Sequence, residues 1–251
     1  MTIKLDNQFY AKIRSALGHE PDRRRSWTDL GRVQKIRPSV GSTSLEERSA
    51  LLATLQERSK INGMPVTLCS DTARAAQVVA GIVKQNLPQE GGPAHVVTWK
   101  HAVIDGLDLE SVLAAEAPQI TVYPADSIDP IAGASERQRA KDLAATAVCG
   151  VTSADWCLAE SATLVMRTRP GQWRSVSLMP PVHIAVITQA SIISDMGELF
   201  TALQRDSQAG YHGLTNCMTF VSGRSTTRDI ESVAVPGAHG PKAVHIVVIT
   251  G

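Results

Sequence analysis

The chain alternates short apolar runs with longer stretches whose apolar residues recur at helical spacing. In chain order the pattern is helical at Leu45–Asn62, apolar at Pro65–Cys69, helical at Thr72–Asn86, apolar at His95–Thr98, helical at Leu109–Ala115 and apolar at Ile120–Tyr123. Short buried strands that alternate with helices indicate βαβ units. We therefore expect an α/β fold built on a mainly parallel sheet.

The second half of the chain is richer in strand-like runs. After a helical stretch at 135–147, these runs are Val148–Val151, Trp156–Leu158, Thr163–Arg167, His183–Thr188, Met218–Val221 and Val244–Ile249, with a helix expected to begin near Asp195. The connection that contains Glu160, Ser161 and Ala162 is short enough for a β-hairpin. We expect an antiparallel hairpin inserted into the parallel arrangement.

The first 44 residues differ from the rest. An amphipathic start around Phe9, Ile13 and Leu17 precedes a charged run and a turn-rich segment. We interpret residues 1–44 as a short helix with an extended arm, and residues 45–251 as one α/β domain. The three arginines at 23–25 form either a solvated charge cluster or a phosphate contact, and the run is too short to indicate nucleic-acid binding.

Composition excludes several classes of function. Lys and Arg total 25 against 24 for Asp and Glu, so the net charge provides no field that attracts polyanions, and no nucleic acid is expected as a partner. No apolar run approaches the roughly 20 residues of a membrane-spanning helix, and the polar start is unlike a secretory signal. We expect a cytoplasmic protein. The cysteines, Cys69, Cys149, Cys157 and Cys217, form no C-x-x-C pair, so they are expected in the core and no metal site is predicted.

The segment from Ser222 to Glu231 is the first candidate for a ligand site. Gly223 permits a tight turn, and the hydroxyl groups of Ser225, Thr226 and Thr227 could hold a carboxylate or phosphate at a helix start. The same hydroxyl groups are also common helix N-caps.

Two carboxylates and a histidine follow. Asp229 and Glu231 could act as an acid-base pair or cap a neighbouring loop, and Arg228 could pair with one of them. His239 lies between glycines, with Pro241 close behind, in a loop that can expose an imidazole whose pKa is near neutrality. It is either catalytic or a hydrogen-bonded loop residue. His183 and His245 are weaker candidates because they lie within apolar runs.

Glu160 occupies the expected hairpin tip. A glutamate at a strand end can accept a proton or act as a nucleophile, and it can equally be an ordinary turn residue. Asp155 and Thr152 have the same two interpretations.

Five motifs taken together resemble one known family. In order along the chain they are G-V-T-S-A-D from Gly150, A-E-S-A-T-L-V from Ala159, S-L-M-P-P-V-H-I from Ser177, S-G-R-S-T-T-R-D-I-E from Ser222 and G-A-H-G-P from Gly237. Their order and spacing resemble the lactate utilisation protein C family, which is the LUD domain family. The resemblance extends from about Leu45 to the C-terminus.

This resemblance implies a three-layer, Rossmann-like α/β fold of the glucosamine-phosphate isomerase, ribose-phosphate isomerase and CoA-transferase type. It also implies a role in the oxidation of L-lactate to pyruvate, beside two partner proteins that carry iron-sulfur clusters. The cofactor, if any, is unknown.

The matching positions are Thr152, Asp155, Glu160, Thr163, His183, Ser222, Ser225, Thr227, Asp229, Glu231, His239 and Gly240. From these we predict Glu160, Asp229 and His239 as catalytic, and Thr152, Thr163, Ser222, Gly223, Ser225, Thr227, Glu231 and Gly240 as ligand-binding. The family usually has glycine where Ala162 stands. Because glycine accepts a positive φ that alanine resists, we expect another turn type or an altered approach to the ligand here.

Three hypotheses follow. The chain is a subunit of an L-lactate oxidation system that binds a small carboxylate or organic cofactor. Alternatively, it is a non-catalytic protein that docks the iron-sulfur partners, with Trp27 and the arginine run in the docking arm. A third hypothesis, based on the fold type alone, is a separate enzyme that acts on a sugar phosphate or a CoA thioester.

Overall fold

The computed structural model describes residues 44–89, 94–129, 133–208, 217–228, 234–236 and 239–251. Contacts divide the chain into two units, 1–37 and 38–251, and the described residues all belong to the second. The predicted N-terminal helix and arm, except its last residue, Ser44, lie outside the described residues.

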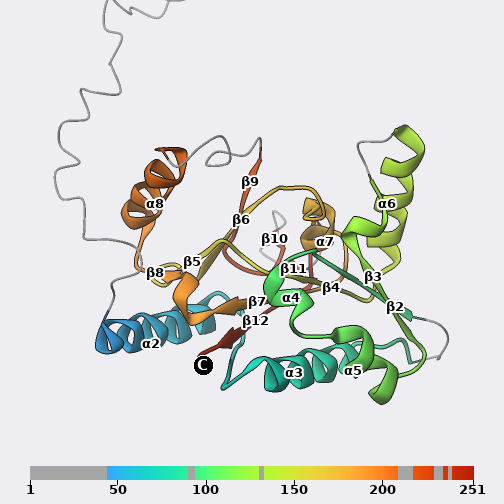
Figure 1. The fold of residues 1–251 in the computed structure, drawn as a ribbon, viewed down its shortest axis with the longest axis horizontal. Coiled ribbons are helices and arrows are strands. Elements are labelled where there is room, and N and C mark those ends of the chain that lie inside the picture. Colours follow the sequence, from blue (N-terminus) through green and yellow to red (C-terminus); the bar gives the residue numbers. More distant parts are fainter. Residues whose placement is uncertain (1–43, 90–93, 130–132, 209–216, 229–233, 237–238) are drawn as a thin grey trace, which may run out of the picture. The chain divides into compact units, whose positions relative to one another are not determined.

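A parallel sheet of six strands forms the centre of the fold (Figure 1). Its strands lie in the order β1 (Val66–Cys69), β12 (Ala243–Ile249), β7 (Val182–Thr188), β4 (Cys149–Thr152), β2 (Ala94–Thr98) and β3 (Ile120–Pro124). Every neighbouring pair in this sheet is parallel. The prediction of an α/β fold with a mainly parallel sheet is confirmed. The neighbouring inner strands β7 and β12 are almost continuously apolar, as expected for strands covered on both faces.

The connections of this sheet change direction between β2 and β4. From β2 the chain continues outward to β3 at the sheet edge, whereas from β4 it continues to β7 on the other side. Neighbouring strands whose connections run in opposite directions define a topological switch point, where open α/β sheets usually bind their ligands beyond the carboxyl ends of the strands.

The helices follow the predicted pattern, with two additional short α-helices, α4 and α7, and two 3-10 turns. They are α2 (Leu45–Ile61), α3 (Thr72–Gln85), α4 (Ala102–Asp105), α5 (Leu109–Glu116), α6 (Ala134–Thr146), α7 (Arg174–Leu178) and α8 (Met196–Gln208), with 3-10 turns η2 (Ala125–Ser127) and η3 (Gln189–Ser191). Local capping fixes two of the starts. Ser44 and Glu47 form a reciprocal capping box at α2, and the Asp71 carboxylate accepts the backbone N–H of Arg74 at α3.

A second sheet contains four short strands in the order β8 (Ile192–Ile193), β5 (Trp156–Leu158), β6 (Thr163–Arg167) and β9 (Met218–Val221). In it β5 pairs antiparallel with β6, and β6 pairs antiparallel with β9. The expected hairpin strands therefore belong to a separate sheet, and not to the parallel one. Two further strands, β10 (Thr226–Arg228) and β11 (Ala234–Pro236), form an antiparallel pair.

Buried apolar side chains form one core on each face of the parallel sheet. On one face, α3, α4 and α5 pack against Val96, Ile184 and Val247. On the other, the core combines Ala185, Ile246 and their neighbours with residues of α2, α6, α7 and the second sheet. A third, smaller core lies between the second sheet and α8. Within the described residues, no helix combines the length and apolarity needed to cross a membrane.

Candidate functional site

A chain of hydroxyl groups joins the β5–β6 turn to the segment after β9. Thr163 Oγ1 lies 2.8 Å from Ser161 Oγ and 2.8 Å from Ser222 Oγ. Thr163 is buried, whereas Ser161 and Ser222 are exposed. The side-chain amide of Asn62, at the end of α2, donates to the carbonyl oxygen of Ser161 at 2.8 Å. Predicted residues Thr163 and Ser222, which are 59 positions apart, are thus in direct contact.

The Ser222–Glu231 and Gly237–Pro241 motifs also meet. Ser225 Oγ accepts the backbone N–H of His239 at 3.2 Å, and the backbone N–H of Ser225 donates to the carbonyl oxygen of Pro241 at 2.9 Å. A Cβ atom at Gly240 would lie 3.3 Å from that of Ser225, so the two segments pack closely. The imidazole of His239 belongs to an exposed residue, as the loop motif predicted.

Glu160 lies in the β5–β6 turn and is exposed. Its backbone N–H donates to the carbonyl oxygen of Ser194 at 3.0 Å. This bond attaches the β5–β6 turn to the residue that follows strand β8. Ala162 has a φ of 48°, in the left-handed region. The expectation of a different turn type was wrong: the alanine adopts the conformation that a glycine would favour, because its buried methyl group and the flanking strands hold it there.

Thr152 and His183 form a different contact inside the parallel sheet. Thr152 Oγ1 lies 2.8 Å from His183 Nε2, and both side chains are fully buried. His183 Nδ1 has no hydrogen-bond partner among the described residues. Burial lowers the pKa of His183 to about 4, with a smaller contribution from His245, so the ring is neutral at physiological pH.

Part of the Ser222–Glu231 segment departs from the prediction. Thr226, Thr227 and Arg228 form strand β10, and not a loop that opens a helix. The segment from Asp229 that was expected to open a helix lies outside the described residues, so the anion site at its start stays a prediction. Gly223 approaches the end of α2, with its Cβ position 3.4 Å from the carbonyl oxygen of Asn62. Asp229 and Glu231 lie outside the described residues.

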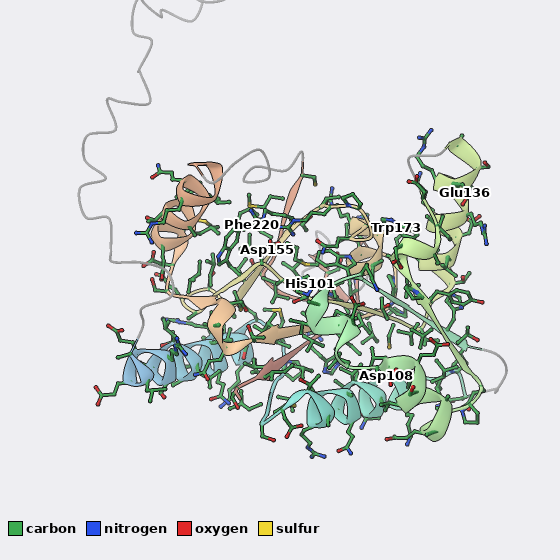
Figure 2. All side chains as sticks on the ribbon, in the orientation of Figure 1. His101, Asp108, Glu136, Asp155, Trp173 and Phe220 are labelled. Carbon is green, nitrogen blue, oxygen red and sulfur yellow. The ribbon has the colours of Figure 1, made fainter. Side chains whose placement is uncertain are left out.

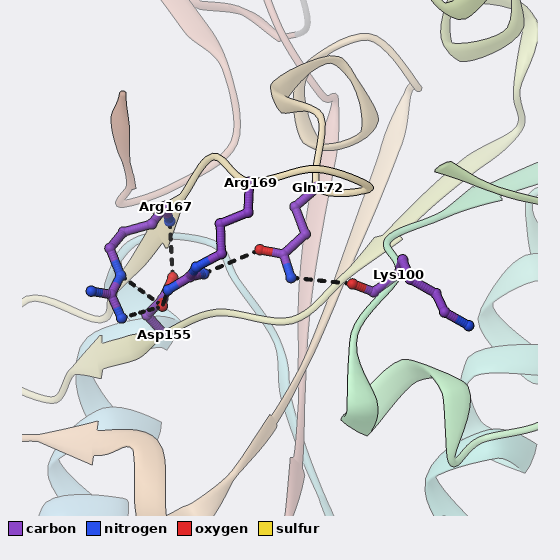
Figure 3. Close-up of polar contacts among 5 residues, drawn as sticks. All are labelled: Lys100, Asp155, Arg167, Arg169 and Gln172. Carbon is purple, nitrogen blue, oxygen red and sulfur yellow. Dashed lines mark hydrogen bonds and ion pairs between the residues drawn. The ribbon is translucent and has the colours of Figure 1, made fainter. Parts of the chain in front are cut away.

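Asp155 is the centre of a fourth polar cluster, shown in Figure 3. Its Oδ2 accepts the backbone N–H of Arg167 at 2.9 Å, and its Oδ1 accepts Arg167 Nε at 2.8 Å and Arg169 Nη2 at 2.5 Å. The Arg167 guanidinium also stacks over the ring of Trp156, 4.5 Å from its centroid. Burial alone would raise the pKa of Asp155, but the hydrogen bonds and charges of the two arginines outweigh burial and hold it below its usual range.

The cluster continues to the segment that follows β2. Arg169 Nη1 donates to Gln172 Oε1 at 3.1 Å, and Gln172 Nε2 donates to the carbonyl oxygen of Lys100 at 3.1 Å (Figure 3). The residue after Lys100 is His101, which lies at the start of α4 (Figure 2). Burial lowers the pKa of the His101 ring, and the charges of Asp155 and Arg169 act on it in opposite directions.

The predicted residues thus fall into three contact groups. Thr163 joins Ser222, Ser225 joins His239 and Gly240, and Thr152 joins His183, while Asp155 pairs with two arginines that the sequence interpretation did not select. One signal could have found them: Arg167 and Arg169 are two residues apart at the end of a strand, so their side chains leave it on the same side. The contacts of Asn62 and Gln172 had no comparable signal.

Of the cysteines, Cys69, Cys149 and Cys157 are buried, as predicted. Burial raises the pKa of Cys149 and of Cys157 to about 12, so both remain thiols at physiological pH. In the part of the chain that the structure describes, no three His, Cys, Asp or Glu side chains gather in a way that could hold a metal ion.

A family model described as the LUD domain matches residues 52–249. Lactate utilization protein C of Halalkalibacterium halodurans is 35% identical over 164 residues, which are 65% of this chain and 66% of that protein. The protein of the same name from a Geobacillus species is 35% identical over 160 residues, 63% of each chain. The chain therefore spans about two thirds or less of the length of these relatives. Uncharacterized protein YkgG of Escherichia coli is 28% identical over 228 residues, 87% of this chain and 93% of its own.

One solved structure has a similar fold. It is the crystal structure of a DUF162 family protein from Deinococcus radiodurans, with a TM-score of 0.53 and 17% sequence identity. The match covers 80% of this chain and 98% of that one. At this identity the likeness concerns the fold alone.

Proposed function

Because the chain belongs to the LUD domain family, we propose that it acts in lactate utilisation, as a subunit of a system that oxidises L-lactate to pyruvate. The observation that carries the proposal is the match over residues 52–249, together with relatives named Lactate utilization protein C. The proposal includes a cytoplasmic location and two partner proteins that carry iron-sulfur clusters. It also includes a fold of the sugar-phosphate isomerase and CoA-transferase type for residues 45–251, preceded by a helix and arm at 1–44.

The proposed ligand is a small carboxylate or an organic cofactor bound near the Thr163–Ser222 and Ser225–His239 contacts. Ser225 Oγ accepts a hydrogen bond from His239, and its own hydroxyl hydrogen has no acceptor among the described residues. That hydrogen is therefore available to an anionic oxygen. Thr163 and Ser222 hold the β5–β6 turn, which carries Glu160, against the same segment.

In this proposal Ser225 and Thr227 hold the anionic group of the ligand, with Thr152, Thr163, Ser222, Gly223, Glu231 and Gly240 as further ligand-binding residues. Glu160, Asp229 and His239 orient the ligand or exchange protons with it. Contacts between motifs far apart in sequence support this grouping, since Thr163 touches Ser222 and Ser225 touches His239.

The test is growth on L-lactate as the sole carbon source. A strain that lacks the gene should fail on L-lactate, grow on pyruvate, and recover when the intact chain is expressed. Normal growth of the deletion strain on L-lactate would count against the proposal unless a second lactate pathway is shown and removed.

Substitutions then separate a ligand site from a docking role. Asp229→Ala and His239→Ala should leave the fold and the co-purification of partners intact but fail to restore growth. If both variants restore growth fully, the proposed site is wrong. Deletion of residues 1–44 should weaken co-purification only if this segment docks the partners.

A further inference from the structure

The switch point of the parallel sheet carries a polar cluster that the proposed site does not use. Lys100 and His101 follow the carboxyl end of β2, and Asp155 follows the carboxyl end of β4. These two strands are neighbours, with Thr98 paired to Val151, and their connections leave in opposite directions. Ligands of open α/β sheets usually bind at this position.

The side chain of Arg169 is fixed here by two hydrogen bonds, but its guanidinium keeps N–H groups that can donate to a ligand. Its guanidinium has five N–H groups; one bonds to Asp155 and one to Gln172. Within the described residues these are the only hydrogen bonds of its guanidinium. The side chain is 33% exposed, whereas those of Asp155 and Arg167 are each 9% exposed. Arg169 therefore presents a pre-oriented, partly solvent-accessible fork.

The backbone around Arg169 is fixed as well. Gly171 has a φ of 72°, and a Cβ atom there would lie 2.8 Å from Lys100 Cβ. The backbone N–H of Lys100 donates to the carbonyl oxygen of Gly171 at 2.9 Å, and Gln172 returns a bond to the carbonyl oxygen of Lys100. These contacts attach the Arg169–Gln172 turn to the end of β2, so little conformational entropy is lost when the fork binds a ligand.

His101 supplies a second donor of defined tautomer. Its Nδ1 accepts the backbone N–H of Val103 at 3.2 Å at the start of α4, so in the neutral ring the hydrogen resides on Nε2. The ring is only partly buried, and the charges of Asp155 and Arg169 both act on it.

We propose that Arg169 and His101 form a binding site for a small carboxylate at the switch point between β2 and β4. The Arg169 fork matches the geometry of a carboxylate, and the Nε2–H group of His101 donates to an oxygen on the neighbouring carbon. This selects 2-hydroxy and 2-oxo carboxylates over simple ones. The choice of lactate and pyruvate as probes rests on the proposed function, whereas the carboxylate site itself rests on the geometry.

The experiment is calorimetric titration of the purified full-length chain with pyruvate, L-lactate, acetate and inorganic phosphate in turn. We expect pyruvate or L-lactate to bind more tightly than acetate or phosphate. Arg169→Gln should weaken that binding roughly tenfold or more, because a charge-assisted hydrogen bond to the carboxylate is lost. Arg139→Gln is the matched control, because the side chain of Arg139 is 68% exposed on α6 and forms an ion pair with Glu136 on the same helix.

Two further variants keep the test decisive. Arg169→Lys retains the charge but loses the fork, and should bind more weakly than the wild type even if Arg169→Gln fails to fold. His101→Asn can still accept the Val103 N–H as a helix cap, so it should weaken pyruvate binding and leave acetate binding unchanged.

Several outcomes would overturn the site. These are no binding of any carboxylate, tighter binding of phosphate than of carboxylates, or wild-type affinity in the folded Arg169 variants. Failure of the proposed function is a separate result: Arg169-dependent binding together with normal growth of the deletion strain on L-lactate would retain the site and reject the pathway.

Discussion

Thr152 Oγ1 and His183 Nε2 lie 2.8 Å apart in the core, between two strands of the parallel sheet. The other ring nitrogen of His183 has no partner within the described residues. The ring is fully buried, and burial lowers its pKa to about 4. His183 therefore folds as a neutral side chain, and protonation opposes folding.

The first prediction is that acid destabilises the folded protein through His183. In the unfolded chain the pKa of His183 is near 6.5, and in the folded chain it is about 4. The unfolded state binds more protons between these values, so the stabilising effect of the neutral ring is complete above about pH 6.5 and is lost as the pH falls towards 4. From about pH 7 to about pH 5, His183 should lower the free energy of unfolding by about 2 kcal/mol, measured by urea denaturation.

His183→Gln provides the comparison for this prediction. Glutamine can still bond to Thr152 but does not titrate, so the variant should lose less stability over the same pH range. The pKa values of His101 and His245 are also lowered, mainly by burial, and act in the same direction in both proteins. Equal pH dependence in the two proteins would contradict a buried neutral His183.

The second prediction concerns Asp155. Asp155→Asn removes the charge that compensates Arg167, whose side chain is 9% exposed, and should lower the free energy of unfolding by about 3–5 kcal/mol. Asp142→Asn is the control, because Asp142 is exposed on α6 and accepts one bond from Gln138. Its effect should stay within about 0.5 kcal/mol. Similar denaturation midpoints for the two variants would show that the buried pair is not required.

The third prediction compares two glycines. A Cβ atom at Gly150 would lie 1.8 Å from the carbonyl oxygen of Val176, so Gly150→Ala must displace α7 from β4. We expect a loss of at least about 1–3 kcal/mol in the free energy of unfolding. At Gly81, in α3, no atom lies within 4 Å of the Cβ position. Gly81→Ala should stabilise the protein by up to about 1 kcal/mol through helix propensity, and thermal melting of both variants tests the contrast.

The fourth prediction separates stability from function at Thr163. Thr163→Val keeps the shape but removes the hydroxyl group that joins Ser161 to Ser222. Both serines are exposed and can bond to water instead, so the stability should change by only about 1 kcal/mol. Under the proposed function, the variant should nevertheless restore growth on L-lactate poorly.

Thr201→Val is the control for Thr163. Thr201 is only partly buried on α8, and its hydroxyl group bonds to the carbonyl oxygen of Gly197. This variant should be stable and support normal growth. If Thr163→Val grows as well as Thr201→Val, the hydroxyl chain has no role in the proposed site.

Local patterns in the sequence determined most of the elements. The predicted helix at Leu45–Asn62 is α2 (Leu45–Ile61), and the predicted strand at Val244–Ile249 lies within β12 (Ala243–Ile249). Apolar periodicity, caps and glycine stops act over a few residues, so they can be recognised without a structure. The short helices α4 and α7 were missed because four or five residues contain too little of a helical period.

Contacts between distant segments were decided only by the tertiary structure. The sequence selected Asp155 but could not pair it with Arg169, and it selected Ala162 but could not show that the flanking strands hold it at a φ of 48°. Such contacts depend on strand order and register, which are set by how the whole chain packs. The sequence thus determined the family, the main helices and strands, and several candidate residues, while packing determined which of those residues meet.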